Sequence, residues 1–273
     1  MTDTDAYIRC LEESKPLREP LFRRIIQSLG LPPGTRGLDV GCGIGHQALL
    51  LADAVGSGGH VTGLDISPEL LLYGEKVVGA SGLAGRVTFR EGDMYRLPFD
   101  DDSFDWAWSA DCLGYPAGEL LPALKEVARV VKPGGSVAIL AWSSQQLLPG
   151  HPLLEARLNA TCSAYAPFFA GVSPEKHFNR ALSWFPEAGL DKPVACTFVG
   201  DVQAPLSRDL RAALASLFEM LWGQPQPTVS PADWSEYQRL CRPESPDIIL
   251  DIPGYYTFFT YTMFKGRVAR QRP

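Results

Sequence analysis

The chain lacks paired cysteines, long apolar runs and clusters of basic residues. Its six cysteines form no Cys-x-x-Cys pair, which excludes zinc-ribbon and thioredoxin-type sites and predicts free thiols in a reducing cytoplasm. No apolar run approaches the roughly 18 residues of a membrane span, and the acidic, polar N-terminus does not resemble a signal peptide. The net charge of −6, with scattered lysines and arginines, excludes a nucleic-acid footprint. We therefore expect a cytoplasmic protein with no membrane partner, no nucleic-acid partner and no metal site.

What the chain does contain is a regular alternation of strand-like and helix-like segments. Strands are expected at residues 36–40, 60–64, 86–90, 104–109, 136–142, 193–200 and 254–264. Helices are expected at residues 45–54, 68–79, 118–131, 152–164, 178–188, 206–222 and 231–241. Such an alternation requires parallel strands joined by right-handed crossovers. The sequence therefore predicts an α/β fold with a doubly wound, mostly parallel, seven-stranded sheet of the Rossmann-like kind.

Two stretches of the second half, residues 143–176 and 205–250, are too long to be plain loops in a compact domain. They are expected to pack together as helical cap insertions. The N-terminal residues are expected to form two helices, 5–14 and 17–29, broken at Lys15-Pro16. The predicted division is an N-terminal segment (1–34), a core (35–142), cap insertions (143–176 and 205–250) and the remainder of the core sheet (177–204 and 251–267).

A glycine-rich turn follows the first predicted strand. Gly41, Gly43 and Gly45 remove three side chains within five positions, so the backbone can turn tightly and approach a ligand closely. The helix that follows points unpaired N–H groups at that ligand. This arrangement predicts a site for an adenosine-containing cofactor.

The spacing of the turn differs from that of a dinucleotide site. A G-x-G-x-x-G fingerprint starting at Gly41 needs glycine where His46 stands. Dehydrogenases normally carry an apolar residue at the position of Asp39. An acid there suits a cofactor with a cationic group, such as the ammonium of a methionine moiety.

Five ordered motifs carry a resemblance to a known family. They are the glycine turn with its Asp39, Gly63-Leu64-Asp65-Ile66-Ser67, Glu91-Gly92-Asp93 with the following Leu97-Pro98-Phe99, Ser103-Phe104-Asp105, and Glu126-Val127-Ala128-Arg129-Val130-Val131-Lys132-Pro133-Gly134-Gly135. Over residues 35–142 the chain resembles the class I S-adenosylmethionine-dependent methyltransferases of the ubiquinone/menaquinone-biosynthesis-like branch (methyltransferase type 11/25). The resemblance implies S-adenosylmethionine as cofactor and S-adenosylhomocysteine as product. It says little about residues 143–250.

The motifs also indicate which residues contact the cofactor. Asp65 ends the second strand, where a carboxylate can accept both ribose hydroxyl protons, although a helix N-terminal acid is the alternative. Asp93 is placed to accept from the adenine amine or to form a turn, and Met94 to pack on the adenine or in the core. In this branch the N-terminal helices tend to fold over the cofactor, which implicates Tyr7. The full set of expected cofactor contacts is Tyr7, Asp39, Gly41, Cys42, Gly43, His46, Asp65, Ile66, Gly92, Asp93, Met94, Ser109 and Ala110.

The implied reaction is an in-line displacement that moves a methyl group to an acceptor. Alignment of the reactants can contribute about 7–11 kcal/mol to such a step. A hydroxyl acceptor would need a general base, for which Asp111, Tyr115 and His177 are candidates. The acidic charge and the predicted cap favour a small, partly apolar acceptor molecule. A non-catalytic cofactor-binding protein and an NAD-type oxidoreductase are the alternatives, and the acceptor, the methylated atom and the oligomeric state stay open.

Overall fold

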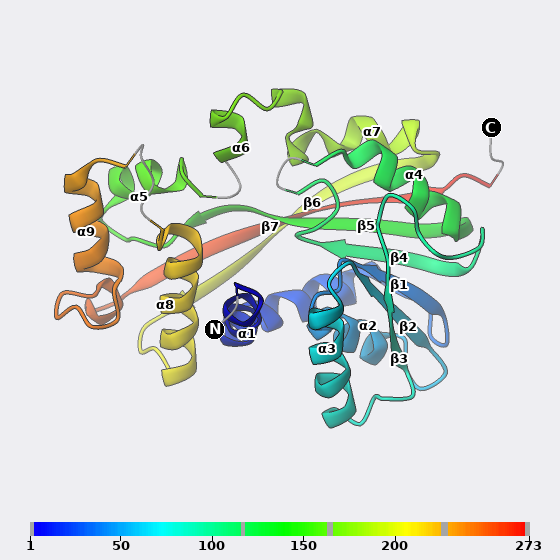
Figure 1. The fold of residues 1–273 in the computed structure, drawn as a ribbon, viewed down its shortest axis with the longest axis horizontal. Coiled ribbons are helices and arrows are strands. Elements are labelled where there is room, and N and C mark those ends of the chain that lie inside the picture. The colour runs from blue at the N-terminus through cyan, green and yellow to red at the C-terminus, as the bar shows by residue number, and fades with distance from the viewer. Residues whose placement is uncertain (1–2, 116–117, 163–165, 225–228, 271–273) are drawn as a thin grey trace. The chain divides into compact units, whose positions relative to one another are not determined.

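The computed structural model describes residues 3–115, 118–162, 166–224 and 229–270. The helices are α1 (Asp3–Leu29), α2 (His46–Ala54), α3 (Pro68–Ala80), α4 (Leu120–Val130), α5 (Pro152–Asn159), α6 (Ala166–Phe169), α7 (Ala181–Glu187), α8 (Arg208–Trp222) and α9 (Pro231–Cys241). The strands are β1 (Arg36–Val40), β2 (His60–Asp65), β3 (Val87–Glu91), β4 (Phe104–Ala110), β5 (Val131–Gln146), β6 (Leu190–Gln203) and β7 (Tyr256–Val268). Figure 1 shows their succession along the chain.

All seven strands belong to one sheet of order β3-β2-β1-β4-β5-β7-β6. The pairs β1–β2, β2–β3, β1–β4 and β4–β5 are parallel, and Asp39 of β1 lies between Gly63 of β2 and Trp108 of β4. Strand β7 runs antiparallel to β5. Thr257, near the start of β7, donates to the carbonyl of Gln146 at the end of β5, whereas Thr260, later in β7, bonds to Ser143, earlier in β5. The predicted Rossmann-like, mostly parallel sheet of seven strands is thus confirmed, with β7 as the antiparallel strand.

The chain divides into two compact units. Unit 1 comprises Met1–Leu21, Ser143–Val172 and Val199–Thr260, and unit 2 comprises Phe22–Trp142, Ser173–Phe198 and Tyr261–Pro273. Within unit 1, helices α5, α8 and α9 contact one another. The domain boundaries drawn from the sequence stay a prediction.

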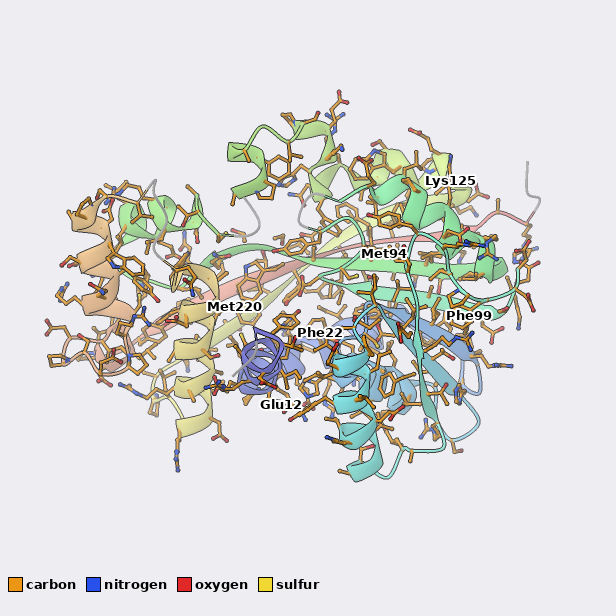
Figure 2. All side chains as sticks on the ribbon, in the orientation of Figure 1. Glu12, Phe22, Met94, Phe99, Lys125 and Met220 are labelled. Carbon is orange, nitrogen blue, oxygen red and sulfur yellow. The ribbon has the colours of Figure 1, made fainter. Side chains whose placement is uncertain are left out.

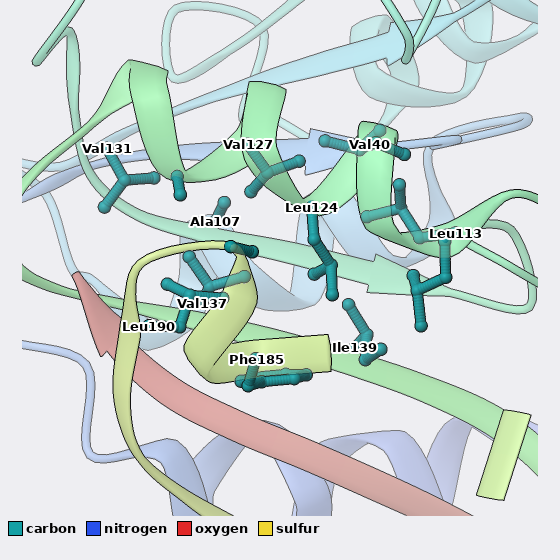
Figure 3. Close-up of a cluster of buried hydrophobic side chains, with 14 of the residues drawn as sticks. Val40, Ala107, Leu113, Leu124, Val127, Val131, Val137, Ile139, Phe185 and Leu190 are labelled. Carbon is teal, nitrogen blue, oxygen red and sulfur yellow. The ribbon is translucent and has the colours of Figure 1, made fainter. Parts of the chain in front are cut away.

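A buried hydrophobic cluster fills one face of the sheet in unit 2 (Figure 3). Leu38 and Val40 of β1 and Ala107 of β4 point into it, and α4 and α7 cover it with side chains such as Leu124 and Phe185. Successive side chains of a strand point to opposite faces. The side chains of Asp39, Trp106 and Trp108 therefore project from the other face, where Phe22 of α1 packs edge-on against Trp108.

The predicted break of the N-terminal helix at Lys15-Pro16 is wrong. One helix runs from Asp3 to Leu29 with Pro16 and Pro20 inside it. Leu17, Leu21, Phe22 and Ile25, on the turns beside these prolines, are all buried. Tertiary packing of this apolar stripe outweighs the local cost of the prolines.

Other boundaries also shift. Strand β5 continues to Gln146, four residues into the predicted cap segment, because β7 supplies bonds to that part of it. Helix α5 ends at Asn159 rather than at residue 164, although 163–165 lie outside the described residues. Helix α7 begins at Ala181, after two short 3-10 turns. No helix in the described part of the chain combines the length and the apolar character needed to cross a membrane.

Candidate functional site at the glycine turn

The turn between β1 and α2 is left-handed at each of its three glycines. The φ angles are 73° at Gly41, 53° at Gly43 and 79° at Gly45, a region that side chains disfavour. A Cβ atom on Gly41 would lie 2.2 Å from the Cys112 Sγ, and one on Gly45 would lie 2.6 Å from the Phe89 ring. Gly45 caps α2 without a side-chain hydrogen bond. The turn therefore needs glycine for both conformation and space, and it presents backbone rather than side chains.

Asp65 ties the end of β2 to this turn. Its Oδ2 accepts a hydrogen bond from the Gly43 backbone N–H (2.9 Å), and its Oδ1 accepts one from Ser67 (3.1 Å). The backbone N–H groups of Gly41 and Cys42 both donate to the Leu64 carbonyl (2.7 and 3.0 Å). Each carboxylate oxygen has a second lone pair, so the turn contact and the predicted ribose contact are compatible. The adjoining Ile66 is 71% exposed, which leaves an apolar side chain at the rim of the turn.

Asp39 is the least satisfied acid of the site. It is 1% exposed, and no donor within the described residues reaches its Oδ2. Burial, reinforced by the negative charge of Asp65, raises the pKa of Asp39 to about 8. A buried carboxylate without a partner is costly, and a cationic group would compensate it.

Two thiols and a thioether line the turn. Cys42 is buried against Gly63, where a Cβ would lie 2.8 Å from its sulfur, and burial raises its thiol pKa. Cys112 lies against Gly41, and burial raises its pKa to about 12, so the thiol stays protonated. The Cys112 Sγ is 4.0 Å from the sulfur of Met94, which is labelled in Figure 2. The sequence did not place Cys112 at the turn. The absence of a side chain at Gly41, which leaves room for Cys112, was the only signal.

The segment after β3 is built around a tight turn. A Cβ on Gly92 would lie 2.9 Å from a Leu64 methyl group, so packing requires glycine there. Asp93 is exposed, and its Oδ1 accepts a hydrogen bond from the Tyr95 N–H (2.9 Å). This bond realises the turn-forming alternative for Asp93, while its contact with an adenine amine stays a prediction.

Ser109 and Ala110 lie at the carboxyl end of β4. The Ser109 hydroxyl donates to the Val40 carbonyl (2.8 Å) and accepts from the Leu113 N–H (3.3 Å), and the residue is 1% exposed. Ser109 thus joins β4 to β1, and Ala110 beside it is half-buried. Their contact with the cofactor stays a prediction.

The three candidate proton acceptors all lie in unit 2. Asp111 accepts hydrogen bonds at both carboxylate oxygens, from the Trp142 N–H (2.8 Å) and the Tyr261 hydroxyl (2.9 Å). Tyr115 packs edge-on against Phe178, with ring centroids 6.4 Å apart. The Nδ1 of His177 accepts from the Asn179 N–H (3.2 Å), so the neutral ring carries its proton on Nε2.

Two further predicted contacts lie at helix positions. His46 is the half-buried first residue of α2, directly after the glycine turn. Tyr7 lies on the part of α1 that belongs to unit 1 and is 51% exposed. Both contacts with the cofactor stay predictions.

Comparison with known proteins agrees with this geometry. A protein family described as "Methyltransferase domain" matches residues 38–135. The demethylmenaquinone methyltransferase of Lysinibacillus sphaericus is 33% identical over 171 residues, which cover 62% of this chain and 68% of that protein. The demethylmenaquinone methyltransferase of Staphylococcus aureus is 38% identical over 130 residues, which cover 46% of this chain and 51% of that protein.

A solved structure shares the fold. The crystal structure of a SAM-dependent methyltransferase from Aquifex aeolicus superimposes with a TM-score of 0.53 at 23% identity, and the match covers 71% of this chain and 93% of that chain. The matched family segment begins at Leu38 and contains the glycine turn, Asp65 and Asp93. The chain therefore belongs to the class I S-adenosylmethionine-dependent methyltransferases, in the ubiquinone/menaquinone-like branch.

Proposed function

We propose that this protein binds S-adenosylmethionine at the glycine turn and transfers its methyl group to a small, partly apolar acceptor. One observation carries the proposal: a buried Asp39 oxygen without a donor stands beside a turn that presents only backbone. A desolvated acid of this kind suits a cationic ligand group, because the positive charge would lower the pKa of Asp39 and stabilise its carboxylate. A dinucleotide offers no such cation at the turn.

The residues present fit that cofactor. Asp39 would hold its ammonium group, the N–H groups of the glycine turn its carboxylate, and Asp65 its ribose hydroxyls. Met94 and the exposed Ile66 would flank the adenine. When bound, the cofactor supplies an electrophilic methyl group on a sulfonium. The protein then has to hold the acceptor in line and exclude water.

The hydrogen bonds of the candidate bases favour a methyl acceptor that the protein does not have to deprotonate. Asp111 already receives two hydrogen bonds, and the neutral His177 ring carries its proton on Nε2. Either group would have to change its bonding before it could take a proton from a substrate hydroxyl. We infer that the acceptor atom is nucleophilic by itself, with Tyr115 and His177 as the residues to test if a base is used.

The relatives and the part of the chain beyond the family match support a proposal for the class of acceptor. Two relatives are named for demethylmenaquinone, so a demethylmenaquinone analogue is the first acceptor to test. The family match ends at residue 135, and residues 143–250 lie beyond it. We therefore propose a ring-containing apolar acceptor of this general kind. A cytoplasmic location is part of the proposal, supported by the six cysteines, none of which forms a disulfide in the described structure.

Ligand-dependent thermal shifts and a turnover assay test the proposal. S-adenosylmethionine and S-adenosylhomocysteine should each raise the melting temperature, and NADH should not. Formation of S-adenosylhomocysteine should then depend on the added acceptor. Stabilisation by NADH alone would overturn the proposal. Binding of S-adenosylmethionine without turnover across a panel of quinone, phenol and amine acceptors would favour a non-catalytic binding protein.

A further inference from the structure

Asp111, the first residue after β4, has an unusual backbone conformation. Its φ is 52°, and in the described part of the chain the other non-glycine residues with positive φ are Asp102 and Lys192. A left-handed conformation is disfavoured for residues with a Cβ and persists where the surroundings impose it. Of these three residues, Asp111 is the one next to the glycine turn, because the adjoining Cys112 lies against Gly41.

Three hydrogen bonds hold Asp111 in this conformation. Its N–H donates to the Leu140 carbonyl (2.8 Å), and its Oδ1 accepts from the Trp142 N–H (2.8 Å). Both its backbone and its side chain are therefore bonded to β5. Its Oδ2 accepts from the Tyr261 hydroxyl of β7 (2.9 Å). Side chain and backbone together join the end of β4 to two other strands.

Tyr261 is itself fixed. It is 0% exposed, and its ring packs at 5.1 Å from that of Phe22, labelled in Figure 2, and at 5.5 Å from that of Trp142. A buried tyrosine needs a partner for its hydroxyl, and Asp111 provides it. The packing of the Tyr261 ring against Phe22 and Trp142 therefore fixes the position of the hydroxyl that donates to Asp111.

The left-handed turn at Asp111 places Cys112. The Sγ and Cβ of Cys112 occupy the space where a Gly41 side chain would be, at 2.2 and 2.5 Å from that Cβ position. The same sulfur lies 4.0 Å from the Met94 sulfur. Cys112 thus forms a wall of the glycine turn, and its position depends on the backbone of Asp111.

We propose that Asp111 and Tyr261 form a latch that positions Cys112, and through it the glycine turn, for cofactor binding. Asp111 is then a positioning residue and not the proton acceptor that the sequence suggested. The effect on cofactor binding rests on the proposed function. The effect on Cys112 does not, because it is a property of the protein without ligand.

Substitutions that remove one atom or keep the shape test the latch. Tyr261→Phe removes the hydroxyl alone, and we expect S-adenosylhomocysteine affinity, measured by calorimetry, to fall about fivefold to tenfold. Asp111→Ala should have at least as large an effect. Asp111→Asn should retain the affinity, because asparagine tolerates the left-handed conformation, accepts from Trp142 and can bond to the tyrosine.

Tyr255→Phe is the matched control. Tyr255 is also 0% exposed, and its hydroxyl donates to the Leu147 carbonyl (3.0 Å) within unit 1. Its loss should lower the melting temperature without changing the affinity for S-adenosylhomocysteine. A fall in affinity equal to that of Tyr261→Phe would show a general loss of stability and overturn the latch.

Alkylation of Cys112, followed by mass spectrometry without any ligand, gives an independent readout. N-ethylmaleimide should react faster with Cys112 in Tyr261→Phe and Asp111→Ala than in the wild type or Asp111→Asn. Unchanged alkylation in all variants would overturn the latch.

Failure of the proposed function can be told apart from failure of the latch. If the wild type does not bind S-adenosylhomocysteine, the proposed function fails, while the alkylation rates still decide whether the latch exists. Loss of turnover in Asp111→Asn with full affinity would assign Asp111 as the proton acceptor instead.

Discussion

Two buried carboxylates, one in each unit, have opposite surroundings. Glu155 of unit 1 is 5% exposed and accepts hydrogen bonds from the N–H groups of Leu147 (2.7 Å) and Leu148 (3.0 Å). Asp39 of unit 2 is 1% exposed, and no donor in the described structure reaches its Oδ2. Burial raises the pKa of both acids.

From this difference we infer a structural role for Glu155 and propose a binding role for Asp39. Glu155 fixes the chain where β5 ends, and nearby buried polar groups are also paired, with the Asn159 side chain accepting from Gln145 and Trp222. Most buried polar groups of proteins have a hydrogen-bond partner, and we propose that a ligand group is the partner of the Asp39 oxygen. We therefore expect substitutions of Glu155 to affect folding and substitutions of Asp39 to affect binding.

Among the single substitutions, the largest loss of stability is expected for Glu155→Ala. The substitution leaves two buried backbone N–H groups without acceptors, which should lower the free energy of unfolding by about 3 kcal/mol. Glu155→Gln keeps one acceptor oxygen and should lose about half of that. Urea denaturation measures both values. Equal stability of Glu155→Ala and the wild type would contradict the structural role.

Asp39→Asn should act on binding instead. The substitution removes the acid that the bound ammonium would hold as a carboxylate, and it is expected to weaken S-adenosylmethionine binding about 100-fold, which corresponds to about 2.7 kcal/mol. The free energy of unfolding should stay level or rise, because an unpaired buried acid is removed. Calorimetric titration and urea denaturation on the same preparation separate the two quantities. A variant that unfolds as easily as Glu155→Ala would show that Asp39 is structural after all.

The sequence predicted the part of the fold that local signals determine. β1 occupies the predicted residues 36–40, and α2 and β2 lie within one residue of their predicted bounds, because periodicity and glycine turns agree there. The break at Pro16 was wrong because long-range packing decided the course of α1. The extension of β5 to Gln146 depends on β7, more than 100 residues further along the chain, and no local pattern reports it.

The site shows the same limit. Glycine spacing indicated a tight turn at Gly41, Gly43 and Gly45, and the structure shows that each of these glycines has a left-handed φ. The bond between Asp111 and Tyr261 joins residues 150 positions apart, so the sequence offered Asp111 only as a candidate base. The missing donor of Asp39 is a property of the packed structure and becomes visible only there.

The pH dependence of stability should also distinguish Asp39. Its pKa is about 8 in the folded protein and about 3.9 in an unfolded chain, so between these values the folded state holds a proton that the unfolded state has lost. The unfolding free energy should therefore fall as the pH rises through this window, by up to about 1.4 kcal/mol per unit. Asp39→Asn should remove most of this slope. Urea denaturation at a series of pH values measures it, and an unchanged slope in the variant would refute the raised pKa.

The smallest effect concerns two tryptophans on one face of β4. The Trp106 indole N–H donates to the Thr35 hydroxyl (3.0 Å), whereas the buried Trp108 indole nitrogen has no partner in the described structure. Thr35→Val keeps the side-chain shape and leaves Trp106 in the condition of Trp108. We expect a loss of about 1 kcal/mol in unfolding free energy and no change in cofactor affinity, because Thr35 precedes β1 at the end opposite the glycine turn. If the affinity fell as well, the unpaired groups near Asp39 would belong to one coupled network, and Trp108 would have to be counted with the binding residues.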